Sequence, residues 1–184
     1  MKNKITVIYS NPYNDTDFEQ YIKQLLRDLN ANSVVTVFDL KKIELNYCTG
    51  CWSCWWKTPG ICALKDEATP IFKSVIESYF LIFASPLIGG FVSADIKKIT
   101  DRLIVLLLPY ITLINGESHH HKRYDKYPQF GLVLKSEPDT DEEDIKIINN
   151  IYDRFALNFH SQCKFVYLSD NVETETIAHE ISTI

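Results

Sequence analysis

Four of the five cysteines stand close together in one segment of the chain. Their spacing is C-x2-C-x2-C-x7-C, at Cys48, Cys51, Cys54 and Cys62. Thiols with this short spacing can converge on one centre, as the ligands of ferredoxin-type iron–sulfur clusters do. Four thiolates also suit zinc, and a C-x2-C pair can act as a redox dithiol. The spacing therefore indicates a metal or redox site, with a loop of reduced, partly buried thiols as the alternative.

A second candidate segment follows an apolar run and contains two adjacent glycines. It begins with Ser85-Pro86, contains Gly89-Gly90 and ends at Ser93. Glycine lets the backbone approach a flat ligand closely, and the backbone amides could bond to the polar edge of a ring. Ser93 can cap the helix that follows. The alternative interpretation is a plain turn between a strand and a helix.

The elements that must position these segments follow from the apolar pattern. Runs rich in β-branched and aromatic residues predict strands at 5–9, 34–38, 79–84, 130–134 and 165–168. Segments with one apolar face predict helices at 17–29, 69–78, 93–107, 141–159 and 173–184. The polar stretch 115–127 is predicted to be a loop. This alternation predicts an α/β fold: a doubly wound, five-stranded parallel sheet with helices on both faces.

The predicted sheet fixes where a ligand would bind. In such a sheet, ligands lie beyond the carboxyl ends of the strands, at the point where the strand order reverses. The loops after the first and third strands are therefore the candidate binding loops. The cysteine segment follows the second strand, so it is expected near the same edge.

Length and charge restrict the class of protein. The 184 residues suit one domain, 1–184, and can bury a sufficient core without disulfides. A net charge of −5 argues against nucleic-acid partners and against an anionic membrane surface. Residues 1–4 lead directly into the first predicted strand and lack the apolar region of a signal peptide. We therefore expect a cytoplasmic protein with reduced thiols and no membrane span.

Three segments resemble a known family. The segment 48–66, with its Trp-Lys-Thr-Pro-Gly-x-Cys core at 56–62, resembles a motif of the NADPH-dependent FMN reductase-like flavoproteins. That group is a branch of the flavodoxin superfamily related to the iron–sulfur flavoproteins. Ser85-Pro86 together with 93–102 resembles the same group's flavin-ring loop and the helix that follows it. The polar segment 122–128 is also similar to a segment of this group.

The resemblance implies a flavodoxin-like fold with FMN bound at the switch point. Ring contacts would come from Pro86, Leu87, Ile88 and Gly89. Phosphate contacts would come from the loop after the first strand, where Ser10, Asn14 and Thr16 can donate hydrogen bonds. One of the three tryptophans of the cysteine segment would be able to cover a ring face. In the iron–sulfur flavoproteins the matching cysteines, here Cys48, Cys51, Cys54 and Cys62, hold a [4Fe–4S] cluster.

The leading hypothesis is an FMN-dependent oxidoreductase that takes electrons from NAD(P)H and passes them to a small acceptor. The acceptor class is a quinone, a free flavin or an aromatic compound. Because the flavin carries the electrons, no catalytic acid or base is nominated. The alternatives are an iron–sulfur flavoprotein that serves as an electron carrier, and a non-catalytic binding module that has lost FMN. A homodimer is the expected assembly, because relatives commonly pair around the flavin.

The predicted phosphate loop departs from the family pattern of Gly-Ser-x-Arg. This chain has Tyr-Ser-Asn-Pro-Tyr-Asn at 9–14, without the arginine, and continues with Asp15 and Asp17. The helix N-terminus still offers backbone amides to an anion. A phosphate beside two carboxylates, however, meets a repulsion on the order of 1 kcal/mol or more even when well solvated. The sequence therefore predicts weaker FMN binding than in typical relatives, or none.

Two further features are assigned structural roles. Adjacent histidines in an extended loop point in alternating directions and chelate poorly as a set, so His119, His120 and His121 are predicted to serve the polar loop, near an anionic cofactor. Cys163 precedes the fifth predicted strand, far in sequence from the other cysteines. It is predicted to be a small buried hydrophobe.

Overall fold

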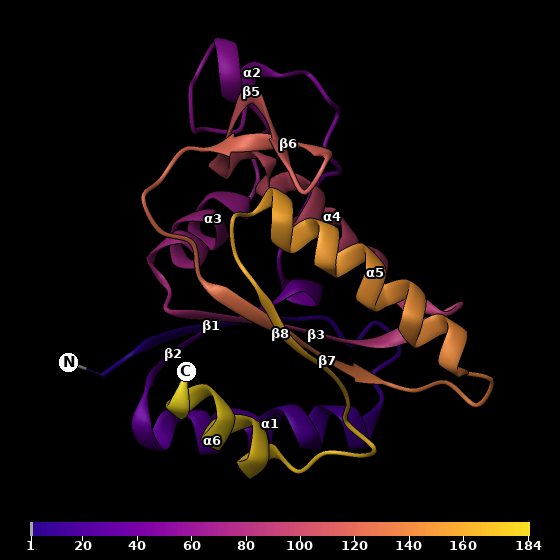
Figure 1. Cartoon of the computed structure of the whole chain (residues 1–184). Helices are drawn as coiled ribbons and strands as arrows, with labels where there is room; N and C mark the ends of the chain where they lie inside the picture. The colour runs from indigo at the N-terminus through magenta and orange to yellow at the C-terminus, as the bar shows by residue number, and fades with distance from the viewer. Residues whose placement is uncertain (1) are drawn as a thin grey trace.

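Five parallel strands form the central sheet, in the order β2-β1-β3-β7-β8 (Figure 1). The computed structural model describes residues 2–184. The strands are β1 Lys4–Tyr9, β2 Val34–Asp39, β3 Phe80–Ile88, β7 Gln129–Lys135 and β8 Cys163–Leu168. This order confirms the predicted doubly wound sheet, and its direction reverses between β1 and β3.

Helices cover both faces of the sheet (Figure 1). One face carries α1 Thr16–Asn32 and α6 Thr174–Thr183. The other carries α3 Ala68–Glu77, α4 Ala94–Arg102 and α5 Glu142–Asn158. Each helix turns its apolar stripe inward, as Phe18, Ile22 and Leu25 of α1 do. The sheet therefore separates two hydrophobic cores, which is why β1 and β3 consist almost entirely of buried apolar residues.

Side-chain caps set where the helices at the binding edge begin. The Asp15 carboxylate accepts from the Phe18 amide at the start of α1 and so caps this helix. Ser93 caps α4 in the predicted way, by accepting from the Ile96 amide. These caps fix the loops after β1 and β3 against the sheet.

The third strand is longer than predicted. Residues 85–88 continue β3 instead of forming a loop, and Leu87 and Ile88 pair with the short antiparallel strand β4 Phe91–Val92. Gly89 and Gly90 make the turn between β3 and β4, with φ of +59° and +73°. Two consecutive positive φ values suit a tight hairpin turn, and glycine adopts them without a side-chain clash. The segment expected to be a loop is therefore a short hairpin.

The segment after α4 also differs from the prediction. The helix expected over 93–107 ends at Arg102, and the 3-10 turn η2 Leu103–Leu106 follows it. The stretch 115–127, predicted as a loop, contains strand β6 Glu117–Lys122, which pairs with β5 Leu107–Ile114 to form a hairpin. This hairpin stands apart from the main sheet (Figure 1). Two shorter elements, the 3-10 turn η1 Leu40–Lys42 and helix α2 Ser53–Trp56, flank the start of the cysteine segment.

The hairpin has a signal in the sequence that the loop prediction missed. Asn115 and Gly116 form its turn with φ of +52° and +83°. An Asn-Gly pair between two extended segments is the strongest short-range indication of a tight hairpin. Strand β6 was not predicted because it is polar and contains three histidines. Only one of its faces is covered by the protein, so it does not need the apolar residues that mark a buried strand.

Among residues 2–184, no helix combines the length and the apolar character needed to cross a membrane.

Candidate functional site

The first candidate loop begins at the carboxyl end of β1. Ser10 is fully buried there, and its hydroxyl donates to the Asp95 carboxylate on α4 over 2.9 Å. The other Asp95 oxygen accepts from Lys98 over 3.3 Å. The hydroxyl that the sequence offered to a phosphate is thus already bonded to a carboxylate.

Several polar groups in the remainder of this loop are bonded to one another. The Asn11 side chain accepts from the Asp15 amide over 2.9 Å and donates to the Asp15 carbonyl over 2.8 Å. The Asn14 amide bonds to the Asn11 carbonyl over 3.1 Å. Asn14 itself has a left-handed backbone, and its side-chain oxygen accepts from Lys41. Thr16 is exposed at the first position of α1.

These contacts decide how well the loop fits the phosphate of FMN. An empty phosphate cradle should present unpaired amides and hydroxyls. Here the amides of Asn14, Asp15 and Phe18 and the hydroxyl of Ser10 are already bonded within the protein. Two of their acceptors are carboxylates, from Asp15 and Asp95. These four donors are therefore not available to a phosphate, and two carboxylates lie beside them, so the loop is a poor fit for a phosphate.

The hairpin after β3 forms the second candidate loop, next to the first. Pro86 and Leu87 are buried, and the Leu87 side chain belongs to the core, so only their backbone can face a ligand. Gly89 lies at the open tip. Among the described residues, no atom lies within 4 Å of where a Cβ would stand on it. The turn thus leaves open space beside its backbone.

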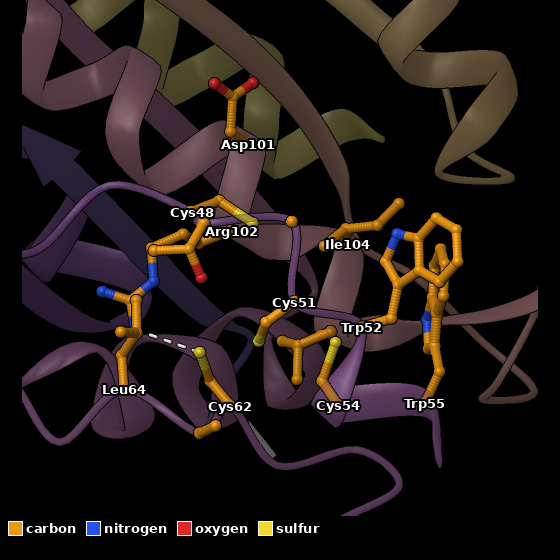
Figure 2. Close-up of a pocket in the computed structure, with 14 residues that line it drawn as sticks. Cys48, Cys51, Trp52, Cys54, Trp55, Cys62, Leu64, Asp101, Arg102 and Ile104 are labelled. Carbon is orange, nitrogen blue, oxygen red and sulfur yellow. Dashed lines mark hydrogen bonds between the residues drawn. The ribbon is translucent and has the colours of Figure 1, made fainter. Parts of the chain in front are cut away.

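The four clustered cysteines surround a separate cavity of about 340 Å³ (Figure 2). Cys48 and Cys51 are exposed, whereas Cys54 and Cys62 are partly buried. Apolar lining comes from both sides of the cavity, through Trp52, Trp55, Leu64, Ile104 and Val105. The fold therefore brings together all four thiols that the sequence singled out.

A buried ion pair holds the cysteine segment in place. Arg102, at the end of α4, contacts Asp66 through two hydrogen bonds of 2.5 and 2.9 Å. Each of these side chains is only 1% exposed. Arg102 also donates to the Asn46 carbonyl and to the Cys62 sulfur, the latter over 3.4 Å. Although burial alone opposes ionisation, the Arg102 bonds and two backbone amides lower the pKa of Asp66 to about 2.

The thiols of this cavity differ in their ionisation. Hydrogen bonds from the Ser53 hydroxyl and amide, and from Thr49, lower the pKa of the exposed Cys51 thiol to about 7. Burial raises the pKa of Cys54, and the neighbouring thiols raise it further. Cys51 is therefore converted to the nucleophilic, metal-binding thiolate more readily than Cys54.

The cavity does not form a compact single-ion site. Within residues 2–184, no three His, Cys, Asp or Glu side chains make a group that could hold one metal ion. The zinc alternative therefore gains no support from this arrangement. Four thiols around a larger space still match in number the ligand set of a four-thiolate cluster.

The cysteine segment contacts the hairpin that carries the three histidines, which the sequence did not predict. Trp55 donates to the Leu107 carbonyl over 3.0 Å and packs on the His120 ring, with ring centroids 4.9 Å apart. Trp52 and Trp56 are 62% and 71% exposed. The three histidines lie on strand β6, so the predicted loop is wrong. Instead, His120 joins the hairpin to the cysteine segment.

The central sheet, its strand order and the open turn at the switch point define a flavodoxin-like α/β protein. No family model matches the chain. It is 31% identical over 100 residues to an iron–sulfur flavoprotein of Methanocaldococcus jannaschii, a match that covers 54% of this chain and 51% of that protein. The chain spans about half the length of the curated relatives it matches.

Solved structures agree with the fold. An azoreductase from Bacillus anthracis superposes with a TM-score of 0.61 at 15% identity, covering 98% of this chain and 93% of that one. A flavodoxin from Streptococcus pneumoniae gives a TM-score of 0.56 at 13% identity and covers 98% of each chain. The predicted resemblance to flavoproteins of the flavodoxin superfamily, related to iron–sulfur flavoproteins, is confirmed.

Proposed function

We propose that this chain is a flavin-dependent oxidoreductase that transfers electrons from NAD(P)H to a small acceptor. The observation that carries the proposal is the open Gly89 turn beside the switch point of a flavodoxin-like sheet. The similar proteins include iron–sulfur flavoproteins and an azoreductase, which supports redox chemistry. A bound flavin supplies hydride and electron transfer through its ring.

The protein's own residues would bind and orient the ring. The amides at the Gly89-Gly90 turn are held in position by the β3–β4 pairing and can bond to the polar edge of a ring. Behind the turn, Asp144 of α5 lies so close to Gly90 that an added Cβ would stand 2.3 Å from its carboxylate. The turn is thus fixed from behind and open in front, which suits a rigid ligand.

Flavin binding is tested by the visible spectrum of protein purified without oxygen, before and after flavin is added and the excess removed. Flavin absorbance that stays with the protein, and that NAD(P)H bleaches, is the expected result. Gly89→Leu should abolish this absorbance because the side chain fills the open space. Gly116→Leu is the matched control, because that turn has a similar positive φ and also faces open space. Protein that retains no flavin would contradict the proposal.

A second candidate function is electron transfer by an iron–sulfur flavoprotein, with a [4Fe–4S] cluster in the cysteine cavity. The specific observation in its favour is that Cys48, Cys51, Cys54 and Cys62 line one cavity. Buried Arg102 beside Cys62 would offset part of the negative charge of a thiolate cluster. A cluster supplies one-electron exchange when bound.

Iron and acid-labile sulfide analysis of anaerobic protein tests this candidate. Close to four irons per chain and a broad brown absorbance would support the cluster. Cys54→Ser should remove the iron, whereas Cys163→Ser, at the distant fifth cysteine, should leave it unchanged. Colourless protein without iron, even after reconstitution, would exclude the cluster and leave the thiols to a different role.

A further inference from the structure

We infer that the flavin site of this chain favours a flavin without a phosphate, such as riboflavin, over FMN. The inference rests on the proposed function, since it names which flavin the same site accepts. It starts from the disagreement between the loop after β1 and a phosphate ligand. The terminal end of the flavin side chain decides this preference, because the ring end of the site is open at Gly89.

The first support is that Asp95 already occupies the Ser10 hydroxyl, which would otherwise be a hydrogen-bond donor to the phosphate. The Ser10 hydroxyl is buried and donates to Asp95 over 2.9 Å, so it has no second proton to offer an anion. The Asp95 side chain is 25% exposed, so it still reaches the surface of the site. A phosphate placed here would meet a carboxylate in place of a hydroxyl donor.

The second support is that the start of α1 already holds an internal anion. The Asp15 carboxylate accepts the Phe18 amide over 2.8 Å, which is the type of donor that a phosphate would use at a helix N-terminus. Asp17 adds a further negative charge in the same turn. The positive end of the helix dipole is therefore already balanced by side chains of the chain itself.

The lysines around this edge of the sheet do not offset the negative charge of these carboxylates. Lys98 is bonded to Asp95 over 3.3 Å, and Lys135 is bonded to Asp170 over 3.1 Å. Lys41 donates to the Asn14 side chain and lines a cavity with Asn14 and Thr16. A phosphate near −2 would therefore face the carboxylates of Asp15, Asp17 and Asp95, with Lys41 as the neighbouring cation that is not paired with a carboxylate. An arginine, which the family pattern places in this loop, is absent from 10–17.

The same carboxylates interact favourably with a flavin whose side chain ends in a hydroxyl. The ribityl chain of riboflavin is neutral and carries hydroxyl donors. The Asp95 and Asp15 carboxylates are acceptors with lone pairs to spare, so they can accept from such hydroxyls. FMN replaces the terminal donor by an anionic acceptor. The same pair of carboxylates thus favours one flavin and repels the other.

The test is a titration of flavin-free protein with riboflavin and, separately, with FMN. Binding is measured by the quenching of flavin fluorescence. At low ionic strength, riboflavin should bind at least roughly tenfold more tightly than FMN, because two nearby carboxylates repel the phosphate of FMN. Raising the salt to about 0.5 M should tighten FMN binding, because it screens the repulsion, and should leave riboflavin unchanged.

Substitutions sharpen the result. Asp95→Asn and Asp15→Asn keep the accepting oxygen of each side chain, and Asn is also a good helix cap, so both variants should fold. Each should tighten FMN binding several-fold and narrow the gap to riboflavin. Glu77→Gln, which removes an exposed charge at the opposite edge of the sheet, should change neither affinity.

The outcomes separate this inference from the proposed function. FMN binding as tightly as riboflavin, or more tightly, would overturn the inference and leave the oxidoreductase proposal standing. Failure of both flavins to bind would overturn the proposed function and the inference with it. Preference for riboflavin that narrows in Asp95→Asn would support both.

Discussion

Two polar regions near the binding edge of the sheet are built in opposite ways. The loop after β1 pairs its own amides and side chains over short sequence separations, as between Asn11 and Asp15. The cysteine segment is held from a distance, by Arg102 acting on Asp66 thirty-six positions away. The first region is therefore held mainly by local bonds, although Ser10 and Asn14 also bond to the distant residues Asp95 and Lys41. The second region is anchored at one end by the Asp66–Arg102 ion pair and leaves two of its thiols exposed. A loop that satisfies itself leaves little for a ligand, and a loop anchored from outside keeps its side chains available.

The largest expected effect comes from removing the buried ion pair between Asp66 and Arg102, which we call the clamp. Asp66→Asn leaves the buried Arg102 charge without its partner and should cost about 3 kcal/mol of the free energy of unfolding. Urea denaturation measures this directly. Asp101→Asn is the control, because its carboxylate is 51% exposed and pairs with a surface lysine, so it should cost less than about 0.5 kcal/mol. Equal costs for the two variants would show that the pair does not anchor the segment.

The same clamp predicts a dependence on pH. The pKa of Asp66 is lowered to about 2 from 3.8, so its stabilising charge is fully present above pH 4. As the pH falls through 2, the carboxyl binds a proton in the folded state as well, and the stability is lost. Unfolding free energies between pH 5 and 2 should therefore fall more steeply for the native chain than for Asp66→Asn. Parallel curves would contradict this assignment.

A smaller effect is expected in thiol reactivity. Because the pKa of Cys51 is about 7, its alkylation by iodoacetamide should rise with pH and level off just above neutrality. Ser53→Ala removes the main hydrogen bond and should slow the reaction at pH 7 about fivefold, as the thiolate fraction falls. Cys163 is an internal reference, since burial raises the pKa of its thiol to about 12. Peptide mapping that finds Cys163 labelled as fast as Cys51 would refute the prediction.

The smallest effect tests the self-contained loop. Asp15→Ala removes the cap of α1 and should cost about 1 kcal/mol of unfolding free energy, whereas Asp15→Asn should cost only a few tenths. Thermal unfolding of the two variants measures the difference. If Asp15→Ala were neutral, the carboxylate would not be serving the helix, and the loop would be freer for a ligand than its contacts indicate.

The sequence determined the sheet and most helices, because their signals are local. Runs such as 5–9 and 79–84 are apolar and β-branched enough to specify buried strands, and the periodicity of 141–159 specifies α5. It also identified the cysteine spacing and the acidic residues Asp15 and Asp17. These features depend on residues near one another in the chain, where propensity and periodicity act.

Only the tertiary structure decided which of these groups remain available. The bond between Ser10 and Asp95 joins positions far apart in the chain, as does the clamp between Asp66 and Arg102. The extension of β3 through Ile88 likewise depends on pairing with β4 and β7. Sequence spacing says which residue types a segment contains. Whether a hydroxyl, amide or thiol is already bonded depends on partners that only folding brings within reach.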